Sequence, residues 1–320
     1  MGVTQETRSS VTLRLSVTDR CDLRCRYCMP ADGVPLVPRA DLPSMEELAS
    51  TAAWLVAHAG VTRVRLTGGE PLLRGGLVEL VRALVATGGV REVSLTTNGS
   101  HLARFAPTLR AAGLARVNVS LDSLDPQRFA EVTRGGDVGA VVAGIKGALA
   151  AGLAPVKLNA VLRRSTWRQD VPELLDFAAM HGLEVRFIEL MRTGPGAAWA
   201  QREFVAAGEV QQWLTAGHPS RSVDAVPGAP ARRMLCRWRN QDQVVGWITP
   251  VSHRFCDSCD RLRLDARGDL HRCLMDSVAL PLVRLLRAGS HDAGAVTRYL
   301  AAKYPPGVME SATPMAAIGG

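Results

Sequence analysis

The chain has 320 residues, of which 47% are hydrophobic, so it can bury a substantial core and is long enough for one large α/β domain with a smaller unit. It has no run of 18 apolar residues and no apolar signal segment, which argues against a membrane span and, with seven cysteines, favours a reducing cytoplasm. The net charge of +8 comes without a block of like charges, so nucleic acid is not an expected partner; only three of the 38 basic residues are lysines, and arginines favour phosphate or carboxylate ligands.

From residue 11 to about residue 190, short β-like runs alternate with amphipathic helical patterns. The predicted strands cover residues 12–17, 61–67, 92–97, 116–120, 155–161 and 184–190. The predicted helices lie near residues 44–59, 75–87, 100–112, 137–151 and 170–181. This alternation predicts right-handed βαβ units and a parallel sheet, in the form of an incomplete (β/α)6 TIM-like barrel. Functional residues are then expected at the carboxyl ends of the strands.

The pattern changes after residue 192. Residues 193–235 are rich in Gly, Pro and Ala and indicate a connecting region. We predict a short hairpin-like unit at 243–248, followed by the second group of cysteines and a tail that ends in Gly319 and Gly320. The chain is therefore divided into a core over 1–235 and a small C-terminal α+β region over 236–320.

Six of the seven cysteines form two triplets. The first has the pattern C-x3-C-x2-C and the second C-x2-C-x13-C; their members are Cys21, Cys25 and Cys28, then Cys256, Cys259 and Cys273. The odd count and the close spacing argue against disulfides. Soft thiolates grouped in this way favour zinc or an iron–sulfur cluster. Zinc usually needs a fourth ligand, and only the second triplet has histidines nearby, His253 and His271.

The first triplet follows a predicted strand directly and so lies at the functional end of the barrel. Three cysteines can hold three irons of a [4Fe–4S] cluster, and the open fourth iron can bind S-adenosylmethionine, whose reductive cleavage gives a 5′-deoxyadenosyl radical. The run Thr-Gly-Gly-Glu-Pro closes the second strand at residues 67–71. Its glycines allow close backbone approach, and Glu70 is a candidate ligand for the methionine ammonium group.

These two motifs resemble those of the radical S-adenosylmethionine superfamily. Further runs at 96–99, 118–122, 186–191 and 255–263, and the terminal Gly319–Gly320, resemble the GTP 3′,8-cyclase family within it. The resemblance covers residues 11–320 and implies two [4Fe–4S] clusters: the first cleaves S-adenosylmethionine, and the second binds GTP through its guanine base. It implies hydrogen abstraction at ribose C3′ and formation of 3′,8-cyclo-7,8-dihydro-GTP, the first step of molybdenum cofactor biosynthesis.

The resemblance also implies ligands and partners. The cofactor-binding residues would be Tyr27, Gly69, Ser120 and Met191. The GTP-binding residues would be Arg14, Arg65, Thr96, Lys157, Arg261, Leu262 through its backbone, and Arg263, and the catalytic residues among them would be Arg14, Arg261 and Arg263. The implied partners are a reductant protein and the downstream cyclic pyranopterin monophosphate synthase; a homodimer stays open.

Alternation along the predicted strands supports an anion site. Arg63 and Arg65 share one face of their strand, Lys157 and Asn159 share one of theirs, and Arg14 and Arg186 add two further strands. Cations directed into one cavity from four strands fit a triphosphate. The alternative is that these side chains pair with acidic residues, namely Glu92, Glu184 or Glu189.

Two other functions stay open at this level. A radical S-adenosylmethionine enzyme that modifies peptides also carries extra C-terminal cysteines, although residues 260–263, Asp-Arg-Leu-Arg, favour a nucleotide. An electron-transfer protein or a zinc-stabilised binding protein would leave the Gly-Gly-Glu-Pro run and the inward cations unexplained.

Overall fold

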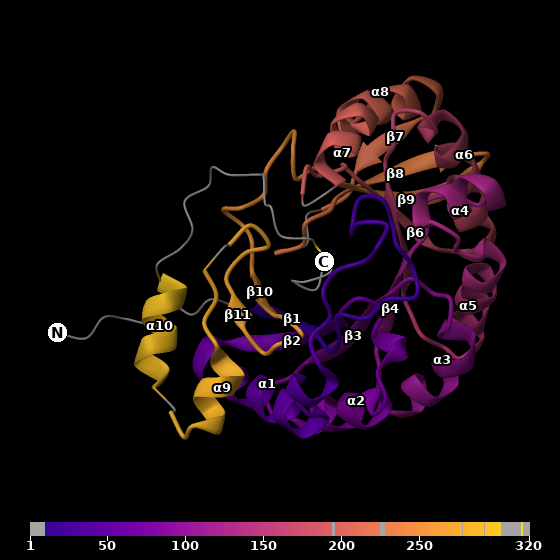
Figure 1. The fold of residues 1–320 in the computed structure, drawn as a ribbon. Coiled ribbons are helices and arrows are strands. Elements are labelled where there is room, and N and C mark those ends of the chain that lie inside the picture. Colours follow the sequence, from indigo (N-terminus) through magenta and orange to yellow (C-terminus); the bar gives the residue numbers. More distant parts are fainter. Residues whose placement is uncertain are drawn as a thin grey trace.

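The structure is a computed structural model that describes residues 10–193, 196–224, 228–276, 278–290, 292–301 and 315. Its centre is one curved sheet of eleven strands in the order β11-β10-β1-β2-β3-β4-β5-β6-β9-β8-β7 (Figure 1). The helices that connect the first six strands cover the outer face of this sheet, while the inner face borders a cavity.

The six central strands run parallel and confirm the α/β prediction. They are β1 (Val11–Ser16), β2 (Val61–Thr67), β3 (Glu92–Thr97), β4 (Arg116–Ser120), β5 (Val156–Val161) and β6 (Glu184–Ile188). Along each strand, apolar side chains alternate with polar ones. Leu13 and Leu15 are fully buried under the outer helices, whereas Arg14 between them faces the cavity. The same alternation on the neighbouring strands gives the barrel an apolar outer layer and a polar interior.

The outer helices agree with the predicted ones and include one that the sequence analysis missed. They are α1 (Met45–Ala59), α2 (Leu77–Ala86), α3 (Leu102–Ala111), α4 (Pro126–Thr133), α5 (Val138–Ala150) and α6 (Trp167–His181). Helix α1 shows why the boundaries were predictable: Ser44 and Glu47 form a reciprocal capping box, and Gly60 ends the helix in the left-handed conformation. Helix α4 was missed because it is only 8 residues long.

Residues 193–235 are not merely a connecting region. They contain α7 (Ala197–Glu203), α8 (Ala207–Gly217), β7 (Ser220–Ser222) and the beginning of β8 (Arg232–Trp238). The predicted hairpin-like unit at 243–248 is confirmed in part: these residues form most of β9 (Gln241–Ile248), the second strand of an antiparallel hairpin whose first strand is β8. The two-unit division of the chain stays a prediction, and its boundary at 235/236 falls inside β8.

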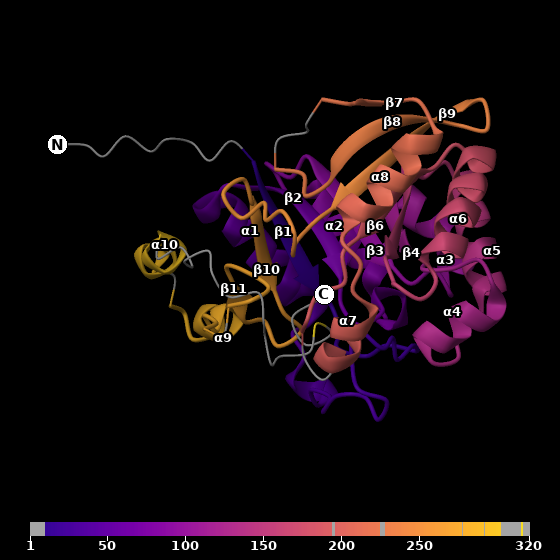
Figure 2. The same cartoon turned by 90° about the horizontal axis from the view of Figure 1, so that it is seen from above.

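C-terminal strands extend the parallel sheet at both edges. Strand β9 pairs with β6 in parallel, and β10 (Arg261–Leu264) pairs with β1 in parallel. The short β11 (Leu270–His271) pairs antiparallel with β10. Figures 1 and 2 place α9 (Leu282–Arg287) and α10 (Ala293–Ala301) at the β11 edge and α8 at the opposite edge. The residues after Cys256 are thus joined directly to the first strand of the barrel.

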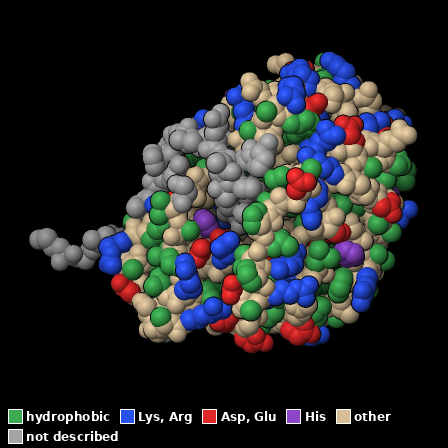
Figure 3. Space-filling model, viewed as in Figure 1, with side chains coloured by type: hydrophobic (Ala, Val, Ile, Leu, Met, Phe, Trp, Pro, Cys, Tyr) green, Lys and Arg blue, Asp and Glu red, His purple; other side chains and the backbone are tan. Residues whose placement is uncertain are grey.

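The outer surface carries mixed charges. On the face shown in Figure 3, Lys and Arg side chains alternate with acidic and apolar ones and do not gather into one basic patch. In the part of the chain that the structure describes, no helix combines the length and the apolar character needed to cross a membrane.

Candidate active site

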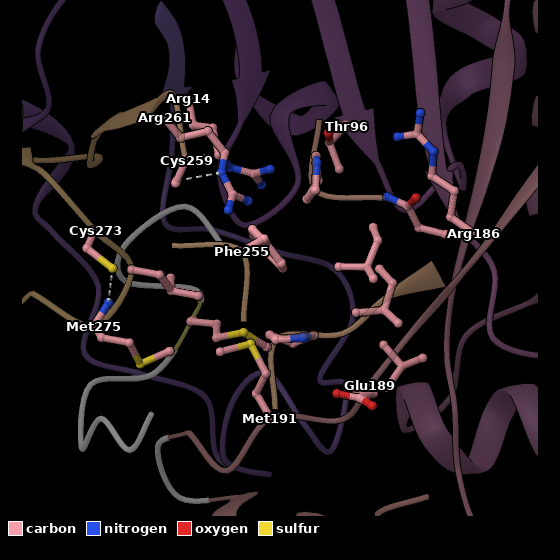
Figure 4. A pocket seen from close by; sticks show the side chains of 18 of the residues that line it. Arg14, Thr96, Arg186, Glu189, Met191, Phe255, Cys259, Arg261, Cys273 and Met275 are labelled. Atoms are coloured by element: carbon pink, nitrogen blue, oxygen red, sulfur yellow. Dashed lines mark hydrogen bonds between the residues drawn. The ribbon is translucent and has the colours of Figure 1, made fainter. Parts of the chain in front are cut away.

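A cavity of about 350 Å³ lies on the inner side of the curved sheet. Its wall is made of inward-facing side chains of the parallel strands and of residues around the second cysteine triplet (Figure 4). The barrel interior is hollow because the inward positions carry arginine, asparagine, threonine and serine instead of the bulky aliphatic residues that fill closed barrels.

Arginines dominate the charge of this cavity. Seven of them line it, against the two carboxylates of Asp122 and Glu189; the arginines are Arg14, Arg65, Arg186, Arg254, Arg261, Arg263 and Arg272. Arg263, Arg14 and Arg65 are direct neighbours across β10, β1 and β2. Three like charges on adjacent strands repel one another, so the arrangement favours an anionic ligand.

Burial and the mutual repulsion of these guanidinium groups lower their pKa values. Burial, with the added repulsion of Arg263, Arg65 and Arg261, lowers the pKa of Arg14. Burial and the charges of Arg116 and Arg186 lower the pKa of Arg65 to about 9. Burial and Arg261 lower that of Arg263 to about 10. An anion in the cavity would reverse each of these effects by stabilising the charged forms.

Two buried polar atoms in the cavity wall also point to a ligand. Nε of Arg65 and Oδ1 of Asn159 have no hydrogen-bond partner within the described part of the chain. Buried polar groups are nearly always hydrogen-bonded, so atoms of this kind in a cavity wall indicate where a bound molecule completes the site.

Two of the predicted cavity cations lie elsewhere. Lys157 does not line the cavity, because its Nζ is 2.8 Å from a carboxylate oxygen of Glu184. Arg63 likewise pairs with Asp260 at 2.6 Å. The alternative raised from the sequence is therefore correct for Lys157, with the predicted partner Glu184, whereas the partner of Arg63, Asp260, was not among the carboxylates predicted. Arg14, Arg65 and Arg186 do line the cavity, as predicted.

Of the other implied GTP-binding residues, three line the cavity and one, Leu262, has its side chain in the core. Thr96, Arg261 and Arg263 line the cavity. Leu262 alternates with them on β10, and its side chain is 4% exposed and belongs to the core. Only the backbone of Leu262 is therefore left to contact a ligand.

All three thiols of the second triplet line the cavity. Arg261 Nε donates to Cys259 Sγ at 3.3 Å, and the backbone N–H of Met275 donates to Cys273 Sγ at 3.4 Å (Figure 4). Burial alone would raise the pKa of Cys259, but the charge and hydrogen bonds of Arg261 outweigh it, so the pKa is lowered. Arg261 also lies over the ring of Phe255, 5.0 Å from its centroid.

The first triplet is held by the surrounding loops. Backbone N–H groups of Arg24 and Arg26 donate to carbonyls at the end of α4, Thr133 and Val132, at 3.0 and 2.9 Å. None of Cys21, Cys25 and Cys28 lines the cavity. Burial raises the pKa of Cys21 to about 12 and also raises that of Cys25. These thiols stay protonated at neutral pH unless a bound metal displaces the protons.

The thiols fit an iron–sulfur cluster better than zinc. All six are free cysteines, whereas Cys236 is buried separately in β8. In the described ranges, no three His, Cys, Asp or Glu side chains converge closely enough to hold one metal ion. A zinc ion needs such convergence, whereas in a [4Fe–4S] cluster each cysteine binds a different iron.

Gly69 and Glu70 contact neighbouring loops of the protein. A Cβ atom at Gly69 would lie 2.2 Å from the carbonyl oxygen of Arg20, so only glycine allows this approach to the cysteine loop. The Glu70 carboxylate accepts from Leu72 N–H (3.0 Å), Asn98 N–H (2.7 Å) and the Thr97 hydroxyl (2.8 Å). Glu70 is 0% exposed and joins these loops; its contact with the methionine ammonium group stays a prediction.

Three of the four implied cofactor-binding residues line the cavity: Tyr27, Ser120 and Met191. The Tyr27 hydroxyl donates to Asp122 at 2.8 Å, and Asp122 also accepts the Val161 N–H at 2.8 Å. Burial raises the pKa of Asp122. Asp122 therefore fixes the orientation of Tyr27 beside the first triplet.

Several cavity residues were absent from the predicted site. They are Asp122, Glu189, Arg254, Phe255, Arg272, Met275 and Met315. Four of them could have been predicted, because they lie within two residues of a cysteine of the second triplet: Arg254, Phe255, Arg272 and Met275. Glu189 is 1% exposed and accepts the backbone N–H groups of Ala207, Val251 and Ser252, so it joins segments; among the described residues it forms no ion pair with an arginine.

Comparison with known proteins identifies the family of this chain. The family model for the radical SAM superfamily matches residues 15–178, and the model named Molybdenum Cofactor Synthesis C matches residues 183–304. The GTP 3′,8-cyclase of Moorella thermoacetica is 46% identical over 285 residues, 88% of this chain and 86% of the relative. GTP 3′,8-cyclase 1 of Pseudomonas aeruginosa is 44% identical over 275 residues, 86% of this chain and 83% of the relative.

A solved structure shares the fold at low sequence identity. Streptococcus suis SuiB bound to S-adenosylmethionine has a TM-score of 0.61 with 14% identity, over 90% of this chain and 67% of that chain. A likeness at this identity concerns the fold alone.

The parallel sheet, the first cysteine triplet and the family model together define the class: the chain is a radical SAM protein. S-adenosylmethionine and a [4Fe–4S] cluster are the cofactors of that class. Within it, the chain belongs to the GTP 3′,8-cyclase family.

Proposed function

We propose that this chain cyclises GTP to 3′,8-cyclo-7,8-dihydro-GTP, the first step of molybdenum cofactor biosynthesis. Family membership supports the proposal, and one structural observation carries it: the arginines of β1, β2 and β10 and all three thiols of the second triplet line the same cavity. A polyanion and a metal-bound base can thus occupy one pocket. We also propose that the second triplet holds a second [4Fe–4S] cluster.

The arginines of the inner strand faces would bind the triphosphate. Arg263, Arg14 and Arg65 offer adjacent guanidinium forks, which suit phosphate oxygens. Binding there would relieve the repulsion that lowers their pKa values. Arg261, which contacts Cys259, would orient the part of the nucleotide nearest the second triplet.

The remaining wall would hold the cofactor and exclude water. When bound, S-adenosylmethionine and the first cluster supply the group that removes a hydrogen atom from the substrate. Tyr27, which belongs to the loop of the first triplet, lines the cavity together with Ser120 and Met191, and these three residues would position that cofactor. Ile188, Leu190 and Phe255 add an apolar surface, which protects a reactive species from solvent.

Two parts of the proposal rest on the family alone. A one-electron reductant and the cyclic pyranopterin monophosphate synthase are the proposed partners. The terminal Gly319 and Gly320 lie outside the described residues; we propose that deleting them abolishes cyclisation while both clusters still assemble. Near wild-type turnover by the truncated protein would contradict this.

Anaerobic turnover tests the proposed function. The reconstituted protein is incubated with S-adenosylmethionine, dithionite and either GTP, ATP or a peptide. We expect 5′-deoxyadenosine together with a cyclised nucleotide from GTP only. Formation of 5′-deoxyadenosine without a GTP-derived product would contradict the proposal and redirect the search to other substrates, peptides first.

A further inference from the structure

Glu189 joins three segments of the chain from a buried place in the cavity wall. It follows β6 directly and is 1% exposed. Its Oε1 accepts the backbone N–H of Ala207 at 3.0 Å and the hydroxyl of Ser252. Its Oε2 accepts the N–H groups of Val251 and Ser252 at 3.0 and 2.8 Å. None of these donors carries a charge, so the buried carboxylate depends on all of them in place of water.

Helix α8 gives Glu189 a fixed point in the core. Ala207 is the first residue of this helix, and the N-cap residue Ala206 makes no side-chain hydrogen bond to it. Glu189 takes over that role, because its carboxylate accepts an N–H of the first turn at the positive end of the helix dipole. The helix itself is anchored by Val210 and Leu214, which are buried in the main core. The position of Glu189 is thereby set.

The loop that Glu189 holds leads directly into the second triplet. It is closed as a turn, since His253 N–H donates to the Thr249 carbonyl at 3.2 Å and the Thr249 hydroxyl donates to the His253 carbonyl at 2.9 Å. The next three residues, 254–256, all line the cavity. Because Ser252 is only four positions before Cys256, a shift of this turn would move the thiol and the Phe255 ring with it.

The neighbours of Glu189 along the chain belong to the cofactor side of the proposed site. Leu190 and Met191 line the cavity, and Met191 is one of the proposed cofactor-binding residues (Figure 4). Glu189 is two positions before Met191, and its carboxylate contacts the turn before Cys256. One buried side chain therefore links the wall proposed for the cofactor to the loop proposed for the nucleotide.

We propose that Glu189 is a positioning residue that sets the spacing between the cofactor and the nucleotide. This inference rests on the proposed function and extends it. Hydrogen transfer needs the reacting atoms in near contact, and a displacement of about 1 Å slows such a step about 100-fold. Binding of each ligand is shared among many contacts and tolerates such a shift better. Weaker contacts of Glu189 should therefore separate cofactor cleavage from cyclisation and leave cleavage itself possible.

Anaerobic turnover of Glu189→Gln tests this inference. The variant keeps the size of the side chain but replaces one acceptor oxygen by an amide NH2 group, so a backbone N–H on that side loses its acceptor. With S-adenosylmethionine, dithionite and GTP, we expect the ratio of 5′-deoxyadenosine to cyclised nucleotide to rise at least about fivefold over wild type. A purely structural role would lower both products together, because only folded, cluster-loaded molecules react. An unchanged ratio would overturn the inference.

Glu203→Gln is the matched control. Glu203 also accepts a backbone N–H and a hydroxyl, both from Ser165, at 3.1 and 2.7 Å, but it does not line the cavity. This variant should keep the product ratio within about twofold of wild type, because its contacts are independent of those of Glu189. An equal rise in both variants would show a general effect of losing a carboxylate and contradict a specific role for Glu189.

A second variant keeps the test valid if Glu189→Gln fails to fold. Ser252→Ala removes the hydroxyl that donates to Oε1 and leaves the three backbone donors in place. The product ratio should rise by a smaller factor, about twofold, because one of four hydrogen bonds is lost. A wild-type ratio in this variant would then count against the inference.

Amide hydrogen exchange of the cluster-loaded protein separates the inference from the proposed function, because it needs no turnover. The amide hydrogens of Val251 and Ser252 should exchange about tenfold faster in Glu189→Gln, since they lose a charged acceptor. If the wild-type protein forms no cyclised nucleotide, the proposed function fails, while the exchange rates still show whether Glu189 holds this loop. Unchanged exchange would overturn the inference independently of any substrate.

Discussion

The two cysteine triplets differ in what they face. All three thiols of the second triplet line the cavity, and Arg261 contacts one of them; none of the three thiols of the first triplet lines it. The first triplet reaches the cavity through Tyr27, which Asp122 holds in place. This difference supports the proposed division of labour, in which the first triplet would act on the cofactor and the second would hold the substrate.

The contacts that hold the two cysteine-bearing loops in place, here called the first and the second support, differ as well. The first loop is held by backbone contacts from the end of β2, where the N–H groups of Gly69 and Glu70 donate to the carbonyls of Thr18 and Arg20 at 2.7 Å. The buried Glu70 carboxylate in turn accepts from three neutral donors, on Leu72, Thr97 and Asn98. The second loop is held by an ion pair between Arg63 and Asp260, with Thr12 as a third member. A buried carboxylate that has only neutral donors has no opposite charge to keep it ionised, so its contacts change with pH. The strength of a partly exposed ion pair depends instead on its geometry and on the salt concentration.

The largest effect is expected from removing one thiol of each triplet. Cys25→Ser should abolish formation of 5′-deoxyadenosine. Cys259→Ser should retain S-adenosylmethionine cleavage and lose the GTP-derived product, because its loop borders the substrate cavity. Product analysis by mass spectrometry distinguishes the two. Loss of 5′-deoxyadenosine in both variants, with the first cluster intact by electron paramagnetic resonance, would contradict the division of labour.

The next effect concerns the pH dependence of the first support. Burial raises the pKa of Glu70 from 4.5 to about 7. The folded state therefore binds this proton more tightly than the unfolded state, and stability should fall by about 3 kcal/mol as pH rises from 4.5 to 7. Denaturant unfolding of cluster-free protein measures this slope. Glu70→Gln should remove it, and a wild-type slope in that variant would exclude Glu70 as its source.

A third prediction concerns the substrate side. Arg65→Met should weaken GTP binding about 100-fold, because it removes one of three adjacent cations, a change of about 2.7 kcal/mol. The ligand-free variant should be no less stable than wild type, since the replaced guanidinium is buried and its Nε has no hydrogen bond within the described chain. Calorimetric titration and thermal unfolding test the two statements. A destabilised variant with normal GTP affinity would assign Arg65 a structural role.

The smallest effect is expected at the second support. Arg63 donates through Nη2 to Asp260 and through Nε to Thr12, at 2.6 and 3.1 Å. A lysine at position 63 would keep the positive charge but could not donate from two nitrogens in the fixed geometry of a guanidinium group. Arg63→Lys should therefore lower the free energy of unfolding by about 1 kcal/mol. Iron content should fall at the second triplet before the first. Equal iron loss at both triplets, resolved by electron paramagnetic resonance, would argue against a local role.

The sequence was most informative where side chains alternate regularly. The six parallel strands and most of their helices followed from the alternation of β-like runs with amphipathic helical patterns. Residues 197–217 were missed because alanine and glycine conceal the helical period of α7 and α8. The positions of Lys157 and Arg63 depend on register across strands, and a sequence shows which residues share a strand face but not which carboxylate stands opposite.

The most direct test of the central claim uses GTP deuterated at C3′. If both triplets serve one cavity, the 5′-deoxyadenosine formed during turnover should gain one deuterium atom from the substrate, detected by mass spectrometry. Unlabelled 5′-deoxyadenosine, formed at the same rate with and without GTP, would show that the cofactor is cleaved without contact with the nucleotide and would contradict the account.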